Sequence, residues 1–569
     1  MQRQSRNPAI WAIMVCGLVF LSVAMFTSAA QKKSSMLGGA RGMVRVAKGT
    51  NFEVEGVGVQ LVSAKTAIRT TVYTNAEGKF EFPVLEAGQY TLRIPSPREF
   101  KPFMKEGVQI SGATQLDDIT LERISDTEFV PPTPETVSQL TGAEWMMNIP
   151  GTGEQKEVMK LDCGFGCHSY QQIMRNRYDE RSWHLILQRM IQGSGSPLIN
   201  MEHPTPTTLD RAHRSALLDE DFLANWLSQA RGPDSKDGPI YFLPRPKGAS
   251  TRVIITEYEL PRELLAPHDV SGDSKGNIWY SAHRSPFSGV LDPHTGVVTQ
   301  YRIPDKEVDT PDVLPGTHRV WVDKNDMVWF SENWDHYLTG LDPKTGKIAY
   351  RWKVEGGVLN SSAFSNFAMD DAGFVYDSRG DSVTKIDSKT GKVLQKWNYK
   401  EASGGTYTGG GTYDSTITPD GRYWSGGTTW GMLILDTQTG KMVSAETGPA
   451  VSSGARGAFD MQGNAWMGGR GGQLMRMNIE TGKMTEWPSP IQYDTFYEAM
   501  PDKNGEVWAG GLESGRFMRF NPKTEKWTQY MMPEPYAHDR RTWIDNSTTP
   551  VTVWFVDHEG YMVRIQPLE

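Results

Sequence analysis

The sequence predicts a mainly β protein of three units, in which a β-sandwich and a small all-α unit precede a seven-bladed β-propeller. Three observations predict this fold class. An aromatic motif recurs at regular spacing through residues 250–569, strand-like alternation of apolar and polar residues fills 37–124, and helical periodicity appears within 125–245. A chain of 569 residues is also too long for one ordinary domain.

Composition narrows the functional classes. The formal net charge is −8 and no long run of Lys or Arg is present, whereas binding of nucleic-acid phosphates needs a basic surface. We therefore expect no nucleic-acid partner. Only three cysteines occur, and the first falls in the N-terminal apolar stretch, so the rest of the chain is not a disulfide-rich scaffold.

Residues 1–30 are expected to be a signal peptide. Two arginines precede an apolar stretch over 9–26, and Ser28 and Ala30 stand at the small-residue positions that a signal peptidase reads. An uncleaved N-terminal anchor is the alternative, because the apolar stretch is nearly long enough to cross a bilayer. The protein is expected to be periplasmic or secreted, with no membrane span after cleavage.

The first unit, over 37–124, consists of short alternating segments separated by turn residues, which predicts an antiparallel β-sandwich. The expected strands cover 52–57, 59–62, 80–82 and 90–94. This order of strands and turns resembles the carboxypeptidase regulatory-like domain, a transthyretin-like β-sandwich. The residues that carry the resemblance are 56–63, Thr74, Gly78, Phe80, Phe82, Leu85, Gly88, Tyr90 and Leu92. The resemblance implies an accessory module without catalytic residues.

The second unit, over 125–245, begins with a proline-rich linker and then changes to helical periodicity. The expected helices cover 144–147, 170–177, 183–191 and 218–230. This segment is therefore expected to form a small all-α unit.

At the centre of this unit, Cys163, Cys167 and His168 form a C-x-x-x-C-H motif. The usual attachment motif for haem c is C-x-x-C-H, so this sequence has one extra residue between the cysteines. With the helices that follow, the unit resembles single-haem cytochrome c domains. The resemblance implies one covalent haem c, with His168 as an iron ligand. A disulfide between the two cysteines, or another metal, is the alternative.

In cytochrome c domains a methionine downstream of the motif usually supplies the sixth iron ligand. Met190 is the best-placed candidate, and Met201 and Met174 are the alternatives. A His–Met pair would favour electron transfer over binding of an external ligand.

The third unit, over 250–569, repeats an aromatic marker that usually follows a glycine by three residues. The markers are Trp279, Trp329, Tyr376, Trp424, Trp466, Trp508 and Trp554. Their spacing of 42 to 50 residues is the period of propeller blades with four strands each. The last blade runs out of chain before its fourth strand, and 252–261 matches the missing strand. We expect this segment to close the ring.

The blade sequence, with PHDV followed by DSKGNIWY, resembles the streptogramin B lyase (virginiamycin B lyase) family over the whole third unit. The resemblance implies opening of a cyclic depsipeptide ester by elimination, with histidines, a glutamate and a magnesium ion near the propeller axis. The family's E-x-H pair is missing, since Ala266 stands where the glutamate would precede His268.

Residues near the start of each innermost strand are expected to face the axial funnel. The candidates there are His268, His318, His538, Tyr413, Arg456 and Glu498. Converging imidazole, phenol, guanidinium and carboxyl groups can form a polar reaction site. The alternative is that these side chains only fill and solvate the funnel.

Three functions follow from these features. The first is an exported redox protein, a possible oxidoreductase, in which haem c exchanges electrons with funnel chemistry, a small-molecule substrate or a redox partner protein. The second is a C–O lyase of the streptogramin type, which the missing E-x-H pair disfavours. The third is a non-catalytic protein that binds glycan or peptide.

Overall fold

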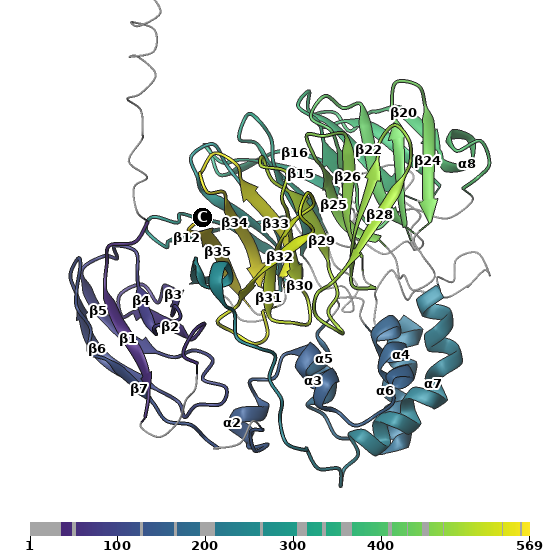
Figure 1. Cartoon of the computed structure of the whole chain (residues 1–569). Coiled ribbons are helices and arrows are strands. Elements are labelled where there is room, and N and C mark those ends of the chain that lie inside the picture. The colour runs from purple at the N-terminus through teal and green to yellow at the C-terminus, as the bar shows by residue number, and fades with distance from the viewer. Residues whose placement is uncertain are drawn as a thin grey trace, which may run out of the picture.

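The computed structural model of the chain shows a propeller with a β-sandwich at its side and a group of helices against one end (Figure 1). The described residues are 36–47, 53–125, 129–163, 168–193, 211–261, 266–303, 316–332, 337–353, 367–379, 381–407, 412–428, 431–446, 454–469, 471–537, 539–557 and 560–569. The predicted signal peptide lies outside them.

The propeller consists of seven antiparallel four-stranded blades. The first blade consists of β9 (Pro267–Gly272), β10 (Ile278–Ala282), β11 (Phe287–Leu291) and β12 (Val298–Arg302). The second consists of β13 (Thr317–Val322), β14 (Val328–Glu332), β15 (Tyr337–Asp342) and β16 (Lys347–Lys353). The third consists of β17 (Ala368–Met369), β18 (Phe374–Arg379), β19 (Ser382–Asp387) and β20 (Val393–Asn398). A short helix, α8 (Tyr399–Ala402), follows the third blade.

The next three blades continue in the same order. The fourth blade consists of β21 (Thr416–Ile417), β22 (Tyr423–Thr428), β23 (Gly431–Asp436) and β24 (Lys441–Glu446). The fifth consists of β25 (Gly454–Phe459), β26 (Asn464–Gly469), β27 (Gln473–Asn478) and β28 (Met484–Pro488). The sixth consists of β29 (Glu498–Pro501), β30 (Val507–Gly511), β31 (Arg516–Asn521) and β32 (Lys526–Met531).

The seventh blade is closed by a strand from far upstream. β33 (Asp539–Asp545), β34 (Thr552–Asp557) and β35 (Tyr561–Pro567) form its inner part, and β8 (Val253–Glu259) pairs antiparallel with β35 as the fourth strand. The prediction that 252–261 completes the last blade is confirmed. Closure leaves no open blade edge at the point where the ring begins and ends.

The repeated aromatic residue is buried in the second strand of each blade, and a local hydrogen-bond pattern explains its spacing. In the first blade the Asp273 carboxylate accepts hydrogen bonds from the Asn277 backbone amide at 2.9 Å and from the Trp279 indole at 3.2 Å. Gly276 between them has a φ of 83°, which favours glycine. Asp460 and Trp466 repeat the bond at 2.7 Å.

The N-terminal sandwich has two sheets around one apolar core. One sheet contains β4 (Lys79–Glu81), β1 (Arg41–Val46) and β7 (Ile119–Leu121), and the other contains β3 (Arg69–Tyr73), β2 (Gly58–Ser63), β5 (Gly88–Arg93) and β6 (Met104–Ile110). The prediction of a strand at 52–57 was wrong, because the described residues 53–57 form no strand. Gly56, with a φ of 75°, turns the chain there, and its amide donates to the Thr74 carbonyl at 2.9 Å.

The sandwich shares a sheet with the propeller. β3 pairs with β8, so the second sandwich sheet continues through β8 into the seventh blade. The Gln60 side chain crosses this junction and donates to the Glu257 carboxylate at 2.9 Å. The two units are therefore joined by backbone hydrogen bonds.

The segment between the sandwich and the propeller is helical. Its helices are α2 (Pro134–Val137), α3 (Gly142–Asn148), α4 (Gly153–Cys163), α5 (Tyr170–Met174), α6 (Glu180–Gly193) and α7 (Arg211–Ala230), and a 3-10 turn, η1 (Gly248–Thr251), leads into β8. The four predicted helices are present, although α5 is shorter and α7 begins earlier than expected. No helix in the described part of the chain is long and apolar enough to cross a membrane.

A buried ion pair locks the three units together. Arg98 of the sandwich donates to the Glu144 carboxylate on α3 at 2.6 Å and to the Leu243 carbonyl, which precedes the propeller, at 2.6 Å. Glu144 also caps its own helix by accepting from the Thr141 amide at 3.0 Å. Both charged side chains are at most 5% exposed, so each depends on the other for compensation.

We predict that Arg98→Met destabilises the protein by about 3–5 kcal/mol, because Glu144 is left as a buried carboxylate without its cation. The midpoint of urea unfolding, followed by tryptophan fluorescence, measures the effect. Lys101→Met is the matched control, since the Lys101–Glu122 pair is about 60% exposed and its loss should change the midpoint little. Equal midpoints for the two variants would contradict the role of the pair.

Candidate functional site

Five of the six predicted funnel residues lie together at the propeller axis, and His538 lies outside the described residues. The His268 and His318 rings are 4.1 Å apart between centroids, and an Arg456 guanidinium nitrogen lies 3.3 Å from His318 Nε2. The Arg456 Cζ atom also lies 5.6 Å from the centre of the Tyr413 ring. Arg456 is opposite Glu498 where β25 and β29 pair in parallel. The first residues of several innermost strands therefore converge, as the sequence predicted.

A buried ion pair holds this cluster. Arg456 donates to Asp269 Oδ1 at 2.5 Å, and both side chains are fully buried. The Asp269 backbone amide donates to Ser281 Oγ at 2.9 Å, and the Ser281 hydroxyl donates to the His318 carbonyl at 2.7 Å. The first, second and fifth blades are thus connected through the axis.

Asp269 also orients His268. The same oxygen, Oδ1, lies 2.7 Å from His268 Nδ1, and on the other side of the ring the Tyr497 hydroxyl lies 3.3 Å from Nε2. The Tyr497 hydroxyl is in turn hydrogen-bonded to that of Tyr413. An imidazole between a carboxylate and a phenol is the arrangement that general acid–base chemistry uses.

His283 is a third imidazole in the cluster, and the sequence prediction missed it. Its ring lies 5.2 Å from that of His268 and 5.6 Å from that of His318. Burial, and then the charges of Arg540, Arg284 and Arg456, lower the pKa of His283 to about 3. Burial and the neighbouring His268 likewise lower the pKa of His318. These two rings are therefore neutral near pH 7.

A second charged network lies beside the first. Arg319 donates to Asp414 Oδ1 at 2.7 Å, and Arg541 lies 3.4 Å from the other oxygen of the same carboxylate. Arg319 and Asp414, like Asp269, directly follow predicted funnel positions along the chain, whereas Arg541 does not. Only that adjacency could have indicated them from the sequence.

Glu498 is a buried carboxyl at the edge of these networks. Its Oε1 accepts from the Thr542 amide, and its Oε2 has no hydrogen-bond partner within the described ranges. Burial raises the pKa of Glu498 to about 7 and outweighs the opposing effect of Arg541. Burial and the charge of Glu498 also raise the pKa of Asp539 well above its usual range.

The helical segment carries its Cys–His motif to this end of the propeller (Figure 1). The Tyr170 amide at the start of α5 donates to the buried Glu513 carboxylate of the sixth blade at 2.9 Å, and the Ala143 amide of α3 donates to the Glu513 carbonyl at 2.6 Å. His168 lies two residues before Tyr170. Burial, and in addition the charge of Arg540, lower the pKa of His168. Arg540 itself lies 5.2 Å over the Tyr497 ring.

Two residues of the Cys–His motif, Cys163 and His168, lie within the described ranges. Cys163 ends α4 and packs against the helical core, and His168 is half-buried with a neutral ring, the form in which imidazole binds a metal. Cys167 and the alternative ligand Met201 lie outside the described residues. Met190 is 37% exposed on α6, whereas Met174 is fully buried in the helical core.

The placement of metal-binding side chains bears on whether the chain can hold a metal ion. In the ranges that the structure describes, no group of three or more His, Cys, Asp or Glu side chains is placed to hold a metal ion. Magnesium in the funnel therefore stays an expectation from the family resemblance.

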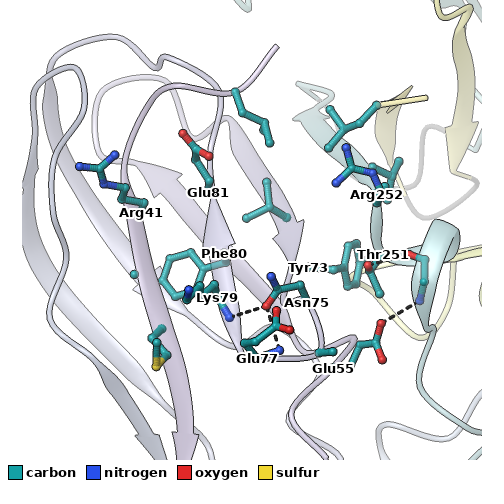
Figure 2. Close-up of a pocket in the computed structure, with 18 of the residues that line it drawn as sticks. Arg41, Glu55, Tyr73, Asn75, Glu77, Lys79, Phe80, Glu81, Thr251 and Arg252 are labelled. Atoms are coloured by element: carbon teal, nitrogen blue, oxygen red, sulfur yellow. Dashed lines mark hydrogen bonds between the residues drawn. The ribbon is translucent and has the colours of Figure 1, made fainter. Parts of the chain in front are cut away.

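A cavity of about 720 Å³ lies between the sandwich and the start of the seventh blade (Figure 2). Arg41, Lys79 and Glu81 line it from the sandwich, and Thr251 and Arg252 line it from η1 and its end. None of the funnel residues lines this cavity, so it is a separate surface with mixed charge.

Comparisons with known proteins agree with part of this architecture. Residues 40–122 match the family model of the carboxypeptidase regulatory-like domain. The predicted identity of the N-terminal sandwich is thereby confirmed. No curated protein matches the chain.

Two solved structures are similar to the propeller part. A streptogramin B lyase structure is 16% identical, with 56% of this chain and 100% of that chain covered and a TM-score of 0.47. A virginiamycin B lyase from Staphylococcus aureus is 15% identical, with 55% and 99% covered and a TM-score of 0.46.

We predict that Glu498→Gln changes the pH dependence of stability. The folded-state pKa of Glu498 is raised from 4.5 to about 7, so its contribution to stability is lost as pH rises through this range, at up to about 1.4 kcal/mol per pH unit. The free energy of unfolding of E498Q relative to the wild type should therefore increase between pH 5 and pH 8. Urea unfolding at both pH values, with exposed Glu480→Gln as control, checks this. A difference that does not vary with pH would show that Glu498 is ionised throughout.

Proposed function

We propose that the protein is an exported redox protein in which one haem c, held by Cys163, Cys167 and His168, exchanges electrons with chemistry in the propeller funnel or with a redox partner protein. The observation that carries this proposal is the position of His168. Arg540, which lies over Tyr497 of the axial cluster, also acts on the pKa of His168. Arg540 thus acts electrostatically on His168 and also contacts the axial cluster, which supports one composite site.

A bound haem would supply one-electron transfer at this position. Cys163, Cys167 and His168 would hold it, with Met190 as a further candidate to bind its iron, and a His–Met pair would favour electron transfer. The half-exposed Met190 side chain is compatible with that role, because it is not part of the helical core. The cytochrome c-like nature of the helical unit is part of the same proposal.

The funnel contributes binding and orientation. The guanidinium groups of buried Arg456 and Arg540 each lie 5.2 Å from the centre of the Tyr497 ring, so two cations contact this phenol. Their positive charge favours an anionic or electron-rich group next to the motif. The chain itself therefore positions a small molecule close to the proposed haem.

A binding protein without catalysis is the second candidate, and the cavity of about 720 Å³ beside the sandwich favours it. Charged side chains of both signs in an open cavity suit a glycan or a peptide. A streptogramin-type C–O lyase has less support, since no glutamate occupies the position two residues before His268.

The test is a visible spectrum of the protein produced in a host with c-type maturation, recorded after denaturation and reduction. A sharp α-band of covalent haem is expected for the wild type and is expected to be lost in the Cys163→Ala, Cys167→Ala double variant. Met190→Leu should keep the covalent haem but change the spectrum of the folded protein, because only an axial ligand is replaced.

Met159→Leu is the control for the methionine variant, since Met159 is a fully buried core residue on α4. Its spectrum should match the wild type. Absence of the α-band in the wild type, while a control cytochrome matures normally, would overturn the haem proposal and favour the binding protein.

A further inference from the structure

A continuous chain of hydrogen bonds runs through the axial cluster. It begins at Asp269, passes through both ring nitrogens of His268 at 2.7 and 3.3 Å, and continues from the Tyr497 hydroxyl to the Tyr413 hydroxyl. The four side chains come from the first, fourth and sixth blades or the loops before them. Only folding of the whole ring brings them together.

The chain has a defined direction. Asp269 is a carboxylate that accepts from Arg456 and from His268 Nδ1, so the His268 proton belongs on Nδ1 and Nε2 is left as an acceptor. Tyr497 must then donate to His268 Nε2, and Tyr413 must donate to Tyr497. Uptake of a proton on Nε2 reverses both phenol bonds, which moves one proton equivalent from Tyr413 to His268.

The path is buried except at its outer end. Asp269 is fully buried, Tyr497 and His268 are at most 4% exposed, and Tyr413 is half-buried at the outer end. Arg456 lies against both phenol rings, at 5.2 and 5.6 Å, so one guanidinium faces both members of the pair. The outer phenol is thus the one placed to meet a bound molecule.

We propose that Asp269, His268, Tyr497 and Tyr413 form a proton relay, and that the Tyr413 hydroxyl is the proton-transfer group of the funnel. His268 is the internal base, and Asp269 and Tyr497 are positioning and relay residues. This inference deepens the funnel part of the proposed function, because it assigns the site a substrate that gives a proton to, or takes one from, a phenol. Among the described residues, the other charged or titratable groups that lie against members of the relay include His283 and His318 beside His268, Arg456 beside Asp269, and Arg540 over Tyr497.

The relay can be tested with p-nitrophenyl acetate as the probe, without a known substrate. The Tyr413 oxygen attacks the ester, a bond from that oxygen to the acetyl carbon forms, and the bond to p-nitrophenolate breaks. The Tyr413 proton passes to Tyr497 as the Tyr497 proton passes to His268 Nε2, so atoms and charge balance. Peptide mass mapping then gives the rate of acetylation at each tyrosine.

We predict that Tyr413 is acetylated faster than any other tyrosine and that His268→Gln slows its acetylation at least about 100-fold, the usual contribution of general base catalysis. Tyr497→Phe should give a similar loss, because it interrupts the relay. His184→Gln is the control, since His184 pairs with Glu220 between α6 and α7 and its loss should leave the rate unchanged. Equal rates in H268Q and the wild type, or preferential labelling elsewhere, would overturn the relay.

A second measurement does not need a folded variant of the cluster. Side-chain ¹⁵N spectra of the wild type should show His268 as the Nδ1–H tautomer. An Nε2–H tautomer in the wild type would also overturn the relay. Neither experiment requires haem, so a failed haem spectrum and a failed relay are distinguishable.

Discussion

The axial site depends on one interaction, the buried pair of Asp269 and Arg456. Both groups are completely removed from water, and a pair of buried charges persists only when geometry and further hydrogen bonds compensate the loss of hydration. Burial opposes the charge on Arg456, but the nearby Asp269 carboxylate holds the pKa of the guanidinium above its usual value. The pair joins the first and fifth blades and sets the orientation of His268. Its partners are therefore fixed before any ligand arrives.

The helical unit shares the propeller end that holds this pair. Glu513 accepts a hydrogen bond from the start of α5 through its carboxylate and one from α3 through its carbonyl, so a single buried residue of the sixth blade holds two helices. Glycine at position 142 permits this contact, because a Cβ atom there would lie 1.8 Å from Glu513 Oε2. The helical segment that contains His168 is thereby held against the sixth blade.

The sequence was sufficient for features that rest on local interactions. Asp273 and Trp279 are six residues apart and bond to each other, so the blade repeat is visible as a pattern. The closing strand was also predictable because it resembles the fourth strands of other blades. The strand expected at 52–57 was wrong because alternation alone does not show that Gly56 adopts a turn conformation.

The candidate site was only partly predictable, because some of its contacts join residues that are far apart in the sequence. His268, His318 and Tyr413 occupy equivalent places in their blades, and Arg456 and Glu498 lie next to such places, so all five could be found by register. Asp269 and Arg456 are 187 residues apart, and nothing in the sequence says that these two charges meet. His283 lies just after a second strand instead of on an innermost one, so the register argument passed over it.

The double pairing of β8 has a consequence for how the chain matures. β8 ends at Glu259, whereas its partner β35 begins at Tyr561, so the strand is made long before the edge that it must join. The sandwich can form early and present β8 through its pairing with β3, with the other edge of β8 still open. An open edge of this kind attracts other strands. Until β35 pairs with it, the open edge of β8 can associate with a neighbouring chain instead, so intramolecular closure competes with intermolecular pairing. The sandwich holds β8 in position for this closure.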